Sequence, residues 1–342
     1  MAIQIGPVAP VAPEHTPQLA AKGSMVALAF GAGDAIYCSV SHDGGKTFAP
    51  PVKVAEEGVF LLTHHRGPRV VVTGDAIVIS AVGGKKAPAG QYPRGDLTVW
   101  RSVDGGKTWS KGTRVNDVPN ASSEALHALA SDGKGTVFAA WLDNRKGHGQ
   151  QLYGARSMDG GVTWLKNVMI YDSPEGSICQ CCHPSAAIDS QGRILVMFRN
   201  WMDGARDMYL TESRDGETFS KPVKLGMGSW HLNACPMDGG GLAVSREGAV
   251  TAWRRDHEIF LAKPGEREVE LGTGSDVALS AGVGGVFAVW SKAGAIQALF
   301  PGENTSRNLA PHGTFPSVVA LANGGALAAW ENDGKIDIQP VR

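Results

Sequence analysis

Residues Ser41–Phe48 read Ser-His-Asp-Gly-Gly-Lys-Thr-Phe, and the same pattern returns at Ser102–Trp109 and at Ser157–Trp164. A shortened copy, Ser-Arg-Asp-Gly-Glu-Thr-Phe, occupies Ser213–Phe219. The glycines allow positive φ in a tight turn, and the Asp carboxylate accepts hydrogen bonds from turn amides. The closing aromatic residue packs the turn against a sheet. Because one turn is repeated along the chain, the sequence predicts an array of similar β units.

These turns resemble the Asp box of the sialidase superfamily, whose members are β-propellers. Asp43 and Asp104 are 61 positions apart, and Asp104 and Asp159 are 55 apart, a spacing that suits successive blades. In that superfamily the box is a structural turn on the face away from the active site. The resemblance therefore implies that Asp43, Asp104, Asp159 and Asp215 belong to the scaffold.

The blade pattern continues beyond the four boxes. Each unit has a short apolar strand, in most cases ending in a large aromatic residue, as a propeller blade requires. These strands are predicted at Met25–Phe30, Ala76–Val82, Thr136–Trp141, Ile194–Phe198, Ala249–Trp253, Val286–Trp290 and Ala326–Trp330. The inner strands before them are predicted at Pro17–Ala21, Pro68–Thr73, Leu126–Ala130, Pro184–Ile188, Gly240–Val244, Val277–Ser280 and Pro316–Leu321.

The predicted fold is all-β, a seven-bladed β-propeller that forms a single domain over residues 1–342. The chain contains 45 glycines and 19 prolines, as expected for many short strands and turns. The last blade ends at Lys335–Gln339 without an outer strand of its own. We expect the N-terminal segment Ala2–Gly6 to supply that strand and close the ring, which removes an exposed sheet edge.

Composition also limits the partners and the compartment. The formal net charge is −1 without a basic block, which argues against nucleic acid as a partner. No apolar run is long enough to insert into a membrane. The partners that we expect are a small-molecule substrate, or a molecule that donates or accepts a metal. The sequence does not determine the oligomeric state. No signal peptide is visible, which fits either a cytoplasmic protein or a mature exported domain; the resemblance favours a periplasmic or secreted protein.

The loops that enter four consecutive inner strands carry an unusual set of Cys and His residues. In a propeller these loops open on the face opposite the Asp boxes, around the central channel where ligands usually bind. Thiolate and imidazole are ligands for copper or zinc. The predicted metal ligands are Cys179, Cys182, His183 and Cys235, with His64, His65, His127, His231 and Cys181 as alternatives.

Three other interpretations of the cysteines stay open. Cys179 could pair within its own loop, although adjacent and one-apart cysteines strain disulfide geometry. Cys181 or Cys182 could pair with Cys235 in a disulfide between neighbouring blades, which an exported protein would favour. The thiols could also simply be buried, as free Cys often is. Cys38 lies apart in the first unit and is expected in the core.

Beyond the boxes, the chain resembles a poorly characterised branch of sialidase-like propellers. That branch has a Cys-rich run before a strand of the fourth blade, an Arg-Asp pair after it, and a Cys-Pro entering the fifth blade. The corresponding residues are the run Cys179–Cys182, the pair Arg206-Asp207 and the pair Cys235-Pro236. The resemblance implies no settled activity.

A sialidase would bind its substrate carboxylate with arginines and use a Tyr nucleophile. Arg66 or Arg69 could supply the first arginine, and Arg145 and Arg206 are further candidates for substrate contact. No tyrosine follows Tyr209, so the nucleophile expected in the last three blades is missing. Tyr92, with Trp201 and Trp230, could instead form a stacking platform.

The sequence thus supports three functional hypotheses. The first is a metal-binding propeller, with copper favoured over zinc, acting as a copper-dependent oxidoreductase or a copper carrier. The second is a sialidase-like glycoside hydrolase. The third is a non-enzymatic propeller that binds glycan or protein, with a structural disulfide or zinc site.

Overall fold

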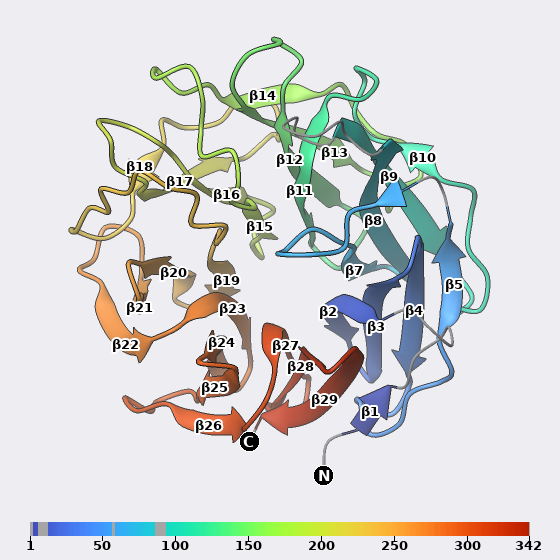
Figure 1. Cartoon of the computed structure of the whole chain (residues 1–342). Coiled ribbons are helices and arrows are strands. Elements are labelled where there is room, and N and C mark those ends of the chain that lie inside the picture. The colour runs from blue at the N-terminus through green and yellow to red at the C-terminus, as the bar shows by residue number, and fades with distance from the viewer. Residues whose placement is uncertain (1–2, 6–12, 57–58, 86–93, 342) are drawn as a thin grey trace.

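The computed structural model describes residues 3–5, 13–56, 59–85 and 94–341. Every regular element in these ranges is a β-strand, arranged in sheets around a central axis (Figure 1). No helix that could cross a membrane occurs in the described ranges. The all-β prediction is therefore confirmed.

Five sheets contain four antiparallel strands each. The first has β2 (Glu14–Lys22), β3 (Met25–Ala32), β4 (Ala35–Ser41) and β5 (Val52–Ala55). Two others have β15 (Ser185–Ile188), β16 (Ile194–Arg199), β17 (Met208–Ser213) and β18 (Val223–Lys224), and β19 (Gly241–Ser245), β20 (Gly248–Arg255), β21 (Glu258–Ala262) and β22 (Val269–Thr273). The remaining two have β23 (Ser275–Gly282), β24 (Gly285–Lys292), β25 (Ala295–Leu299) and β26 (Arg307–Ala310), and β27 (Thr314–Ala320), β28 (Ala326–Asn332), β29 (Lys335–Val341) and β1 (Ile3–Ile5).

A nine-stranded sheet lies between the first and the second of these. It holds β6 (Val59–Phe60) and two runs of four antiparallel strands. The runs are β7 (Arg69–Thr73), β8 (Ala76–Lys85), β9 (Arg94–Ser102) and β10 (Thr113–Arg114), and β11 (Ser122–Ser131), β12 (Val137–Asp143), β13 (Gln151–Ser157) and β14 (Val168–Tyr171). Pairing of Ser122 with Gly95 joins the two runs. This arrangement accommodates the predicted blade pattern.

The ring closes through the N-terminal strand. β1 pairs antiparallel with β29, with Ile3 opposite Ile338 and Ile5 opposite Ile336. β1 lies beside β29, the last strand of the chain, in Figure 1. The predicted closure by an N-terminal strand is thus confirmed, and the last sheet has no unpaired edge at β29.

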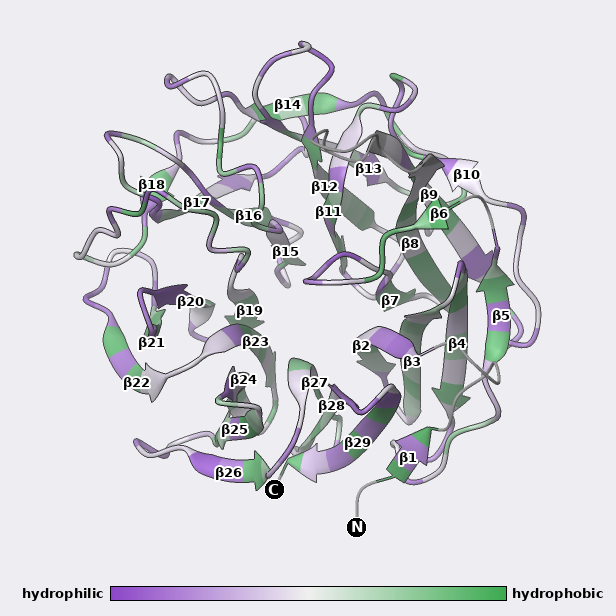
Figure 2. Cartoon of the chain, in the orientation of Figure 1, coloured by the Kyte–Doolittle hydropathy of each residue, from purple (hydrophilic) through white to green (hydrophobic). Residues whose placement is uncertain are grey.

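Buried side chains lie between neighbouring sheets. Trp141, Trp290 and Trp330 lie near the ends of β12, β24 and β28, Trp100 lies in β9, and all four are at most 2 % exposed. β8 and β12 are largely hydrophobic, whereas β29 alternates between hydrophobic and hydrophilic residues (Figure 2). Each sheet therefore packs on both faces against its neighbours around the ring, as expected for radial repetition.

The Asp boxes form the turn between the third and fourth strands of their units. In the first box, Asp43 Oδ1 accepts hydrogen bonds from the amides of Lys46 and Thr47, both at 2.9 Å, and Thr47 Oγ1 donates to Oδ2 at 2.6 Å. The hydrogen bonds from Thr47 are the main cause that lowers the pKa of Asp43. Corresponding carboxylate bonds to turn amides occur at Asp104, Asp159 and Asp215. The structural role implied for these residues fits this geometry.

The second glycine of the box also brings the turn against the preceding blade. Gly45 has φ +84°, and a Cβ there would lie 2.0 Å from Cδ1 of Leu327 in β28. A Cβ at Gly106, with φ +87°, would lie 2.7 Å from Cγ2 of Val40 in β4. Glycine is required at these positions both for its φ and for the close approach.

Candidate metal centre

The antiparallel order of strands places the Cys-rich loops opposite the boxes. A box follows the third strand of its unit, whereas the Cys run precedes β15, the inner strand of the next sheet. Because neighbouring strands alternate in direction, a loop before the first strand and a turn after the third strand lie at opposite ends of a blade. The predicted separation of the two features is therefore built into the topology.

Three cysteine sulfurs meet in the loop before β15. The sulfurs of Cys179, Cys181 and Cys182 all lie within 4.8 Å of one another, and all three residues are buried. Cys179 Sγ is 3.5 Å from Cys182 Sγ and 3.8 Å from Cys181 Sγ. The structure thus brings together the two Cys residues of the predicted ligand set that share this loop.

The fourth sulfur comes from the loop before β19. Cys235 forms a disulfide with Cys181, 54 positions earlier in the chain. The expectation that Cys235 acts as a thiolate ligand is therefore corrected for this state, because a disulfide sulfur has no thiolate to offer. The pairing of Cys181 with Cys235 was one of the open alternatives, and it links the β15 and β19 loops.

The two remaining thiols differ in their surroundings. The hydrogen bond between Cys179 and Cys182 is the largest cause that lowers the pKa of Cys179; the charges of Arg199 and Arg206 add to it, while burial opposes it. Burial is the main cause that raises the pKa of Cys182. The pair therefore favours a thiolate on Cys179 and a thiol on Cys182.

An arginine and a methionine contact the sulfur cluster, which consists of Cys179, Cys181, Cys182 and Cys235. Arg206 Nη1 donates to Cys179 Sγ at 3.2 Å, and its Nε donates to the Leu232 carbonyl at 3.0 Å. The side chain of Met237 packs against the three buried cysteines. Sequence reasoning missed Met237, although its position two residues after Cys235 was the available signal.

His183 does not join the sulfur cluster. Its Nε2 lies 3.2 Å from the Gly240 carbonyl, and its ring centroid is 4.4 Å from that of His65. His65 Nε2 in turn lies 2.8 Å from Asp276 Oδ1. Burial, followed by the charges of His65 and Arg69, lowers the pKa of His183, so a neutral imidazole is expected at physiological pH.

The other predicted histidines are separated from the cysteines. His127 is fully buried in β11, where its Nε2 lies 2.9 Å from Ser80 Oγ; burial, with a contribution from Arg69, lowers its pKa to about 3. His64 and His231 are exposed. Among the described residues, the group of metal-ligand side chains found within 4.8 Å of one another contains cysteines alone.

His65, His183 and Asp276 line a second feature, a cavity of about 280 Å³ in the channel between inner strands. Arg69 also lines it, and this buried guanidinium donates only to the carbonyls of Pro68 and His65, without an ion-pair partner among the described residues. Burial lowers the pKa of Arg69 to about 10. The cavity thus holds a guanidinium that forms no ion pair among the described residues, while the Asp276 carboxylate that also lines it contacts His65.

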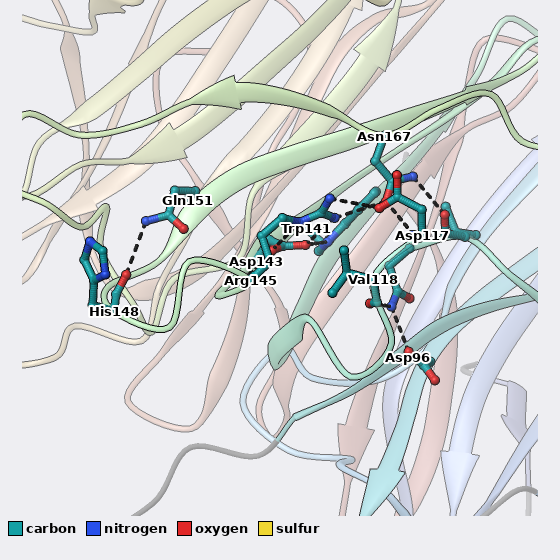
Figure 3. Close-up of polar contacts among 11 residues, drawn as sticks. Asp96, Asp117, Val118, Trp141, Asp143, Arg145, His148, Gln151 and Asn167 are labelled. Carbon is teal, nitrogen blue, oxygen red and sulfur yellow. Dashed lines mark hydrogen bonds and ion pairs between the residues drawn. The ribbon is translucent and has the colours of Figure 1, made fainter.

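Three of the arginines proposed for substrate contact, Arg66, Arg145 and Arg206, are engaged in contacts within the protein. Arg66 forms an ion pair with Glu124, and Arg206 binds Cys179. Arg145 donates to both oxygens of the buried Asp143 and to Asp117 (Figure 3). These contacts satisfy the guanidinium groups within the protein. Tyr92 lies outside the described residues.

Comparisons with known proteins show which folds resemble this one. Residues 95–234 match the BNR repeat-like domain, and no curated protein is similar enough in sequence to match. A polysaccharide lyase described as an ulvan lyase of family PL25 has 12% identity and a TM-score of 0.61, with 99% of this chain and 96% of that chain covered. A Hadza microbial sialidase has 16% identity and a TM-score of 0.55, covering 94% and 74%.

A protein of unknown function from Dyadobacter fermentans is also similar, with 17% identity, a TM-score of 0.56, and 97% and 95% of the two chains covered. These identities are low enough that the likeness concerns the fold. The chain has the β-propeller fold of these structures, and its residues 95–234 match the BNR repeat-like domain. Its sulfur cluster is the feature that the fold alone does not account for.

Proposed function

We propose that this propeller binds copper(I) at the sulfur cluster. The observation that carries the proposal is the buried pair of free thiols, Cys179 Sγ and Cys182 Sγ, which lie 3.5 Å apart. Thiolate and thioether sulfurs are soft ligands that select copper(I). Cys179 and Cys182 supply two thiols in the disulfide state, and the Met237 thioether adjoins them.

Charge and geometry favour copper(I) over zinc at this cluster. A structural zinc site uses four ligands in a tetrahedron, and four cysteine ligands would exist here only after reduction of the Cys181–Cys235 disulfide. Arg206 at 3.2 Å from Cys179 Sγ, with Arg199 nearby, offsets thiolate charge. The buried cluster, without a substrate pocket of its own among the described cavities, fits a copper carrier better than an oxidase.

The disulfide supports the expectation of an exported protein, because disulfides persist in oxidising compartments. A metal donor or acceptor is then the partner we propose. Exchange of the metal with such a partner would take place on the face opposite the Asp boxes, where the exposed Cys235 marks the outer side of the cluster.

The test is a copper titration with matched variants. Metal-free protein is supplied with copper(I) under anaerobic conditions, freed of weakly bound metal, and measured by plasma mass spectrometry. Wild-type protein and the Cys38→Ala control, which removes a buried thiol outside the cluster, should each retain one copper per chain. The Cys179→Ala/Cys182→Ala variant should retain none while keeping the circular dichroism of the wild type. Full occupancy in that variant would refute the proposal.

The cavity around Arg69 favours a second candidate function, the binding of an anionic glycan in the channel. Its support is the buried Arg69 guanidinium, which forms no ion pair among the described residues. None of the described tyrosines lines this cavity, so binding is a better hypothesis than hydrolysis with a Tyr nucleophile. Calorimetric titration with a uronic acid should show binding to wild type and none to Arg69→Gln; equal binding by both proteins would exclude the role of Arg69.

A further inference from the structure

The sulfur cluster combines a disulfide with two free thiols in direct contact. Cys179 and Cys182 have the Cys-x-x-Cys spacing, and their sulfurs are 3.5 Å apart. Cys179 Sγ also lies 3.8 Å from Cys181 Sγ, one sulfur of the disulfide. Thiol and disulfide sulfurs at such distances are positioned for exchange, which proceeds by attack of one sulfur on another.

Exposure differs sharply along this set of sulfurs. Cys179, Cys181 and Cys182 are 1%, 5% and 2% exposed, whereas Cys235 is an exposed residue. Its neighbours Asn233 and Ala234 are exposed as well. Of the four clustered cysteines, Cys235 is thus the one that a molecule in solution can reach.

We propose that the sulfur cluster is a thiol–disulfide relay that exchanges electrons with small thiols and disulfides at Cys235. This activity goes beyond metal binding and requires no metal. It assigns the buried Cys179 and Cys182 as the internal dithiol, Cys181 as the connecting sulfur, and Cys235 as the outer contact.

The internal step consists of two exchanges. Cys179 sulfur attacks Cys181 Sγ, so that a Cys179–Cys181 bond forms and the bond to Cys235 breaks, with the electron pair leaving on Cys235 sulfur. Cys182 sulfur then attacks Cys179, which releases Cys181. Two thiol protons pass in effect from Cys179 and Cys182 to Cys181 and Cys235, and no net oxidation occurs.

The external step consumes a small disulfide. The Cys235 sulfur attacks the small disulfide and releases one small thiol, leaving a mixed disulfide on Cys235. Cys181 then attacks Cys235 Sγ, releases the second small thiol and restores the Cys181–Cys235 bond. The net reaction oxidises Cys179 and Cys182 to a disulfide and reduces one small disulfide to two thiols.

The positions of the sulfurs distinguish this relay from direct oxidation of Cys179 and Cys182 by an external disulfide. Cys179 and Cys182 are too deeply buried for an external disulfide to reach without opening the loop, whereas Cys181 already contacts Cys179. Removal of Cys181 should therefore isolate the internal dithiol from Cys235. Cys38, buried in β4 of the first sheet, provides a thiol unconnected to the cluster.

The experiment uses metal-free protein in the presence of a chelator, with oxidised glutathione as probe. Samples are quenched in acid, alkylated under denaturing conditions and mapped by peptide mass spectrometry. Wild type and Cys38→Ala should release two glutathione thiols per chain and form the Cys179–Cys182 disulfide. In Cys181→Ser, Cys235 should retain glutathione, and oxidation of Cys179 and Cys182 should be at least about tenfold slower.

Three results would overturn the relay. The first is equal oxidation rates of Cys179 and Cys182 in wild type and Cys181→Ser. The second is a wild-type adduct on a cysteine other than Cys235 at limiting oxidised glutathione, a measurement that needs no variant. The third is absence of oxidation in wild type. Because copper is excluded throughout, these results leave the copper proposal standing, and failure of the copper titration leaves the relay standing.

Discussion

The Asp-box turns and the sulfur cluster are built in opposite ways. In each box the Asp carboxylate accepts hydrogen bonds from amides a few positions later, as Asp43 does from Lys46 and Thr47. The box is repeated along the sequence. The cluster joins Cys181 to Cys235 across 54 positions and occurs once. A repeated local feature serves the blade in which it lies, whereas the single non-local feature links two neighbouring sheets.

The largest expected effect comes from breaking the non-local link. Replacing Cys235 by Ala removes the disulfide between the β15 and β19 loops, and the loss of this constraint should lower the free energy of unfolding by roughly 2–4 kcal/mol. Chemical denaturation of wild type and Cys235→Ala measures the difference, with Cys38→Ala as the control. Equal stability of the variant and wild type would show that the disulfide is not a staple between blades.

A box glycine should give the next effect. Gly45→Ala places a Cβ against the buried Leu327 and forces Ala to positive φ, which should cost about 2–3 kcal/mol. Gly44→Ala has positive φ but no atom within 4 Å of the added Cβ, and should cost about 1 kcal/mol. Denaturant titration compares the two variants. Equal losses would mean that the contact with the preceding blade contributes nothing.

Copper binding should respond to Arg206 without loss of the fold. Arg206→Gln removes the guanidinium that donates to Cys179 Sγ, and copper(I) affinity should fall about tenfold because a charge-assisted hydrogen bond is lost. Competition with a chromogenic copper(I) chelator measures the affinity. The control is Arg193→Gln, which removes an arginine paired with Asp189 and Glu212 instead. An unchanged affinity in Arg206→Gln would mean that Arg206 does not assist the metal.

The smallest effect concerns acid stability of the boxes. Hydrogen bonds from the amides of Thr218 and Glu217 lower the pKa of Asp215 from 3.8 to about 2. A carboxyl group with a lowered folded-state pKa contributes stability above its unfolded pKa, and this contribution is lost as pH falls through the folded value. The stability gap between wild type and Asp215→Asn should therefore shrink between pH 4 and pH 2. A gap that stays constant over this range would contradict the assignment.

The strands and turns of the blades could be predicted from the sequence because the residues that determine them lie close together in the chain. A few neighbouring residues determine each Asp-box turn and each apolar strand, such as those that contain Trp141 or Trp330. The closure of β29 by Ile3–Ile5 followed from the missing outer strand. The likeness to sialidase-like propellers follows the same local signals.

The site was less predictable because its contacts depend on side-chain direction in three dimensions. Three cysteines within four positions gave several possible partners for Cys235, and only the folded loop selects Cys181. His183 follows Cys182 directly, yet its ring turns toward His65 in the channel. Arg66 and Arg69 are three positions apart, but Arg66 forms an ion pair with Glu124, whereas Arg69 lines the cavity.

The central claim is that the unrepeated cluster binds copper through sulfur. X-ray absorption at the copper K edge, measured on wild-type protein loaded with one copper(I) per chain, tests it most directly. We predict a first coordination shell of sulfur alone, which disappears in Cys179→Ala/Cys182→Ala. A shell dominated by nitrogen, as the channel histidines His65 and His183 would supply, would contradict the account.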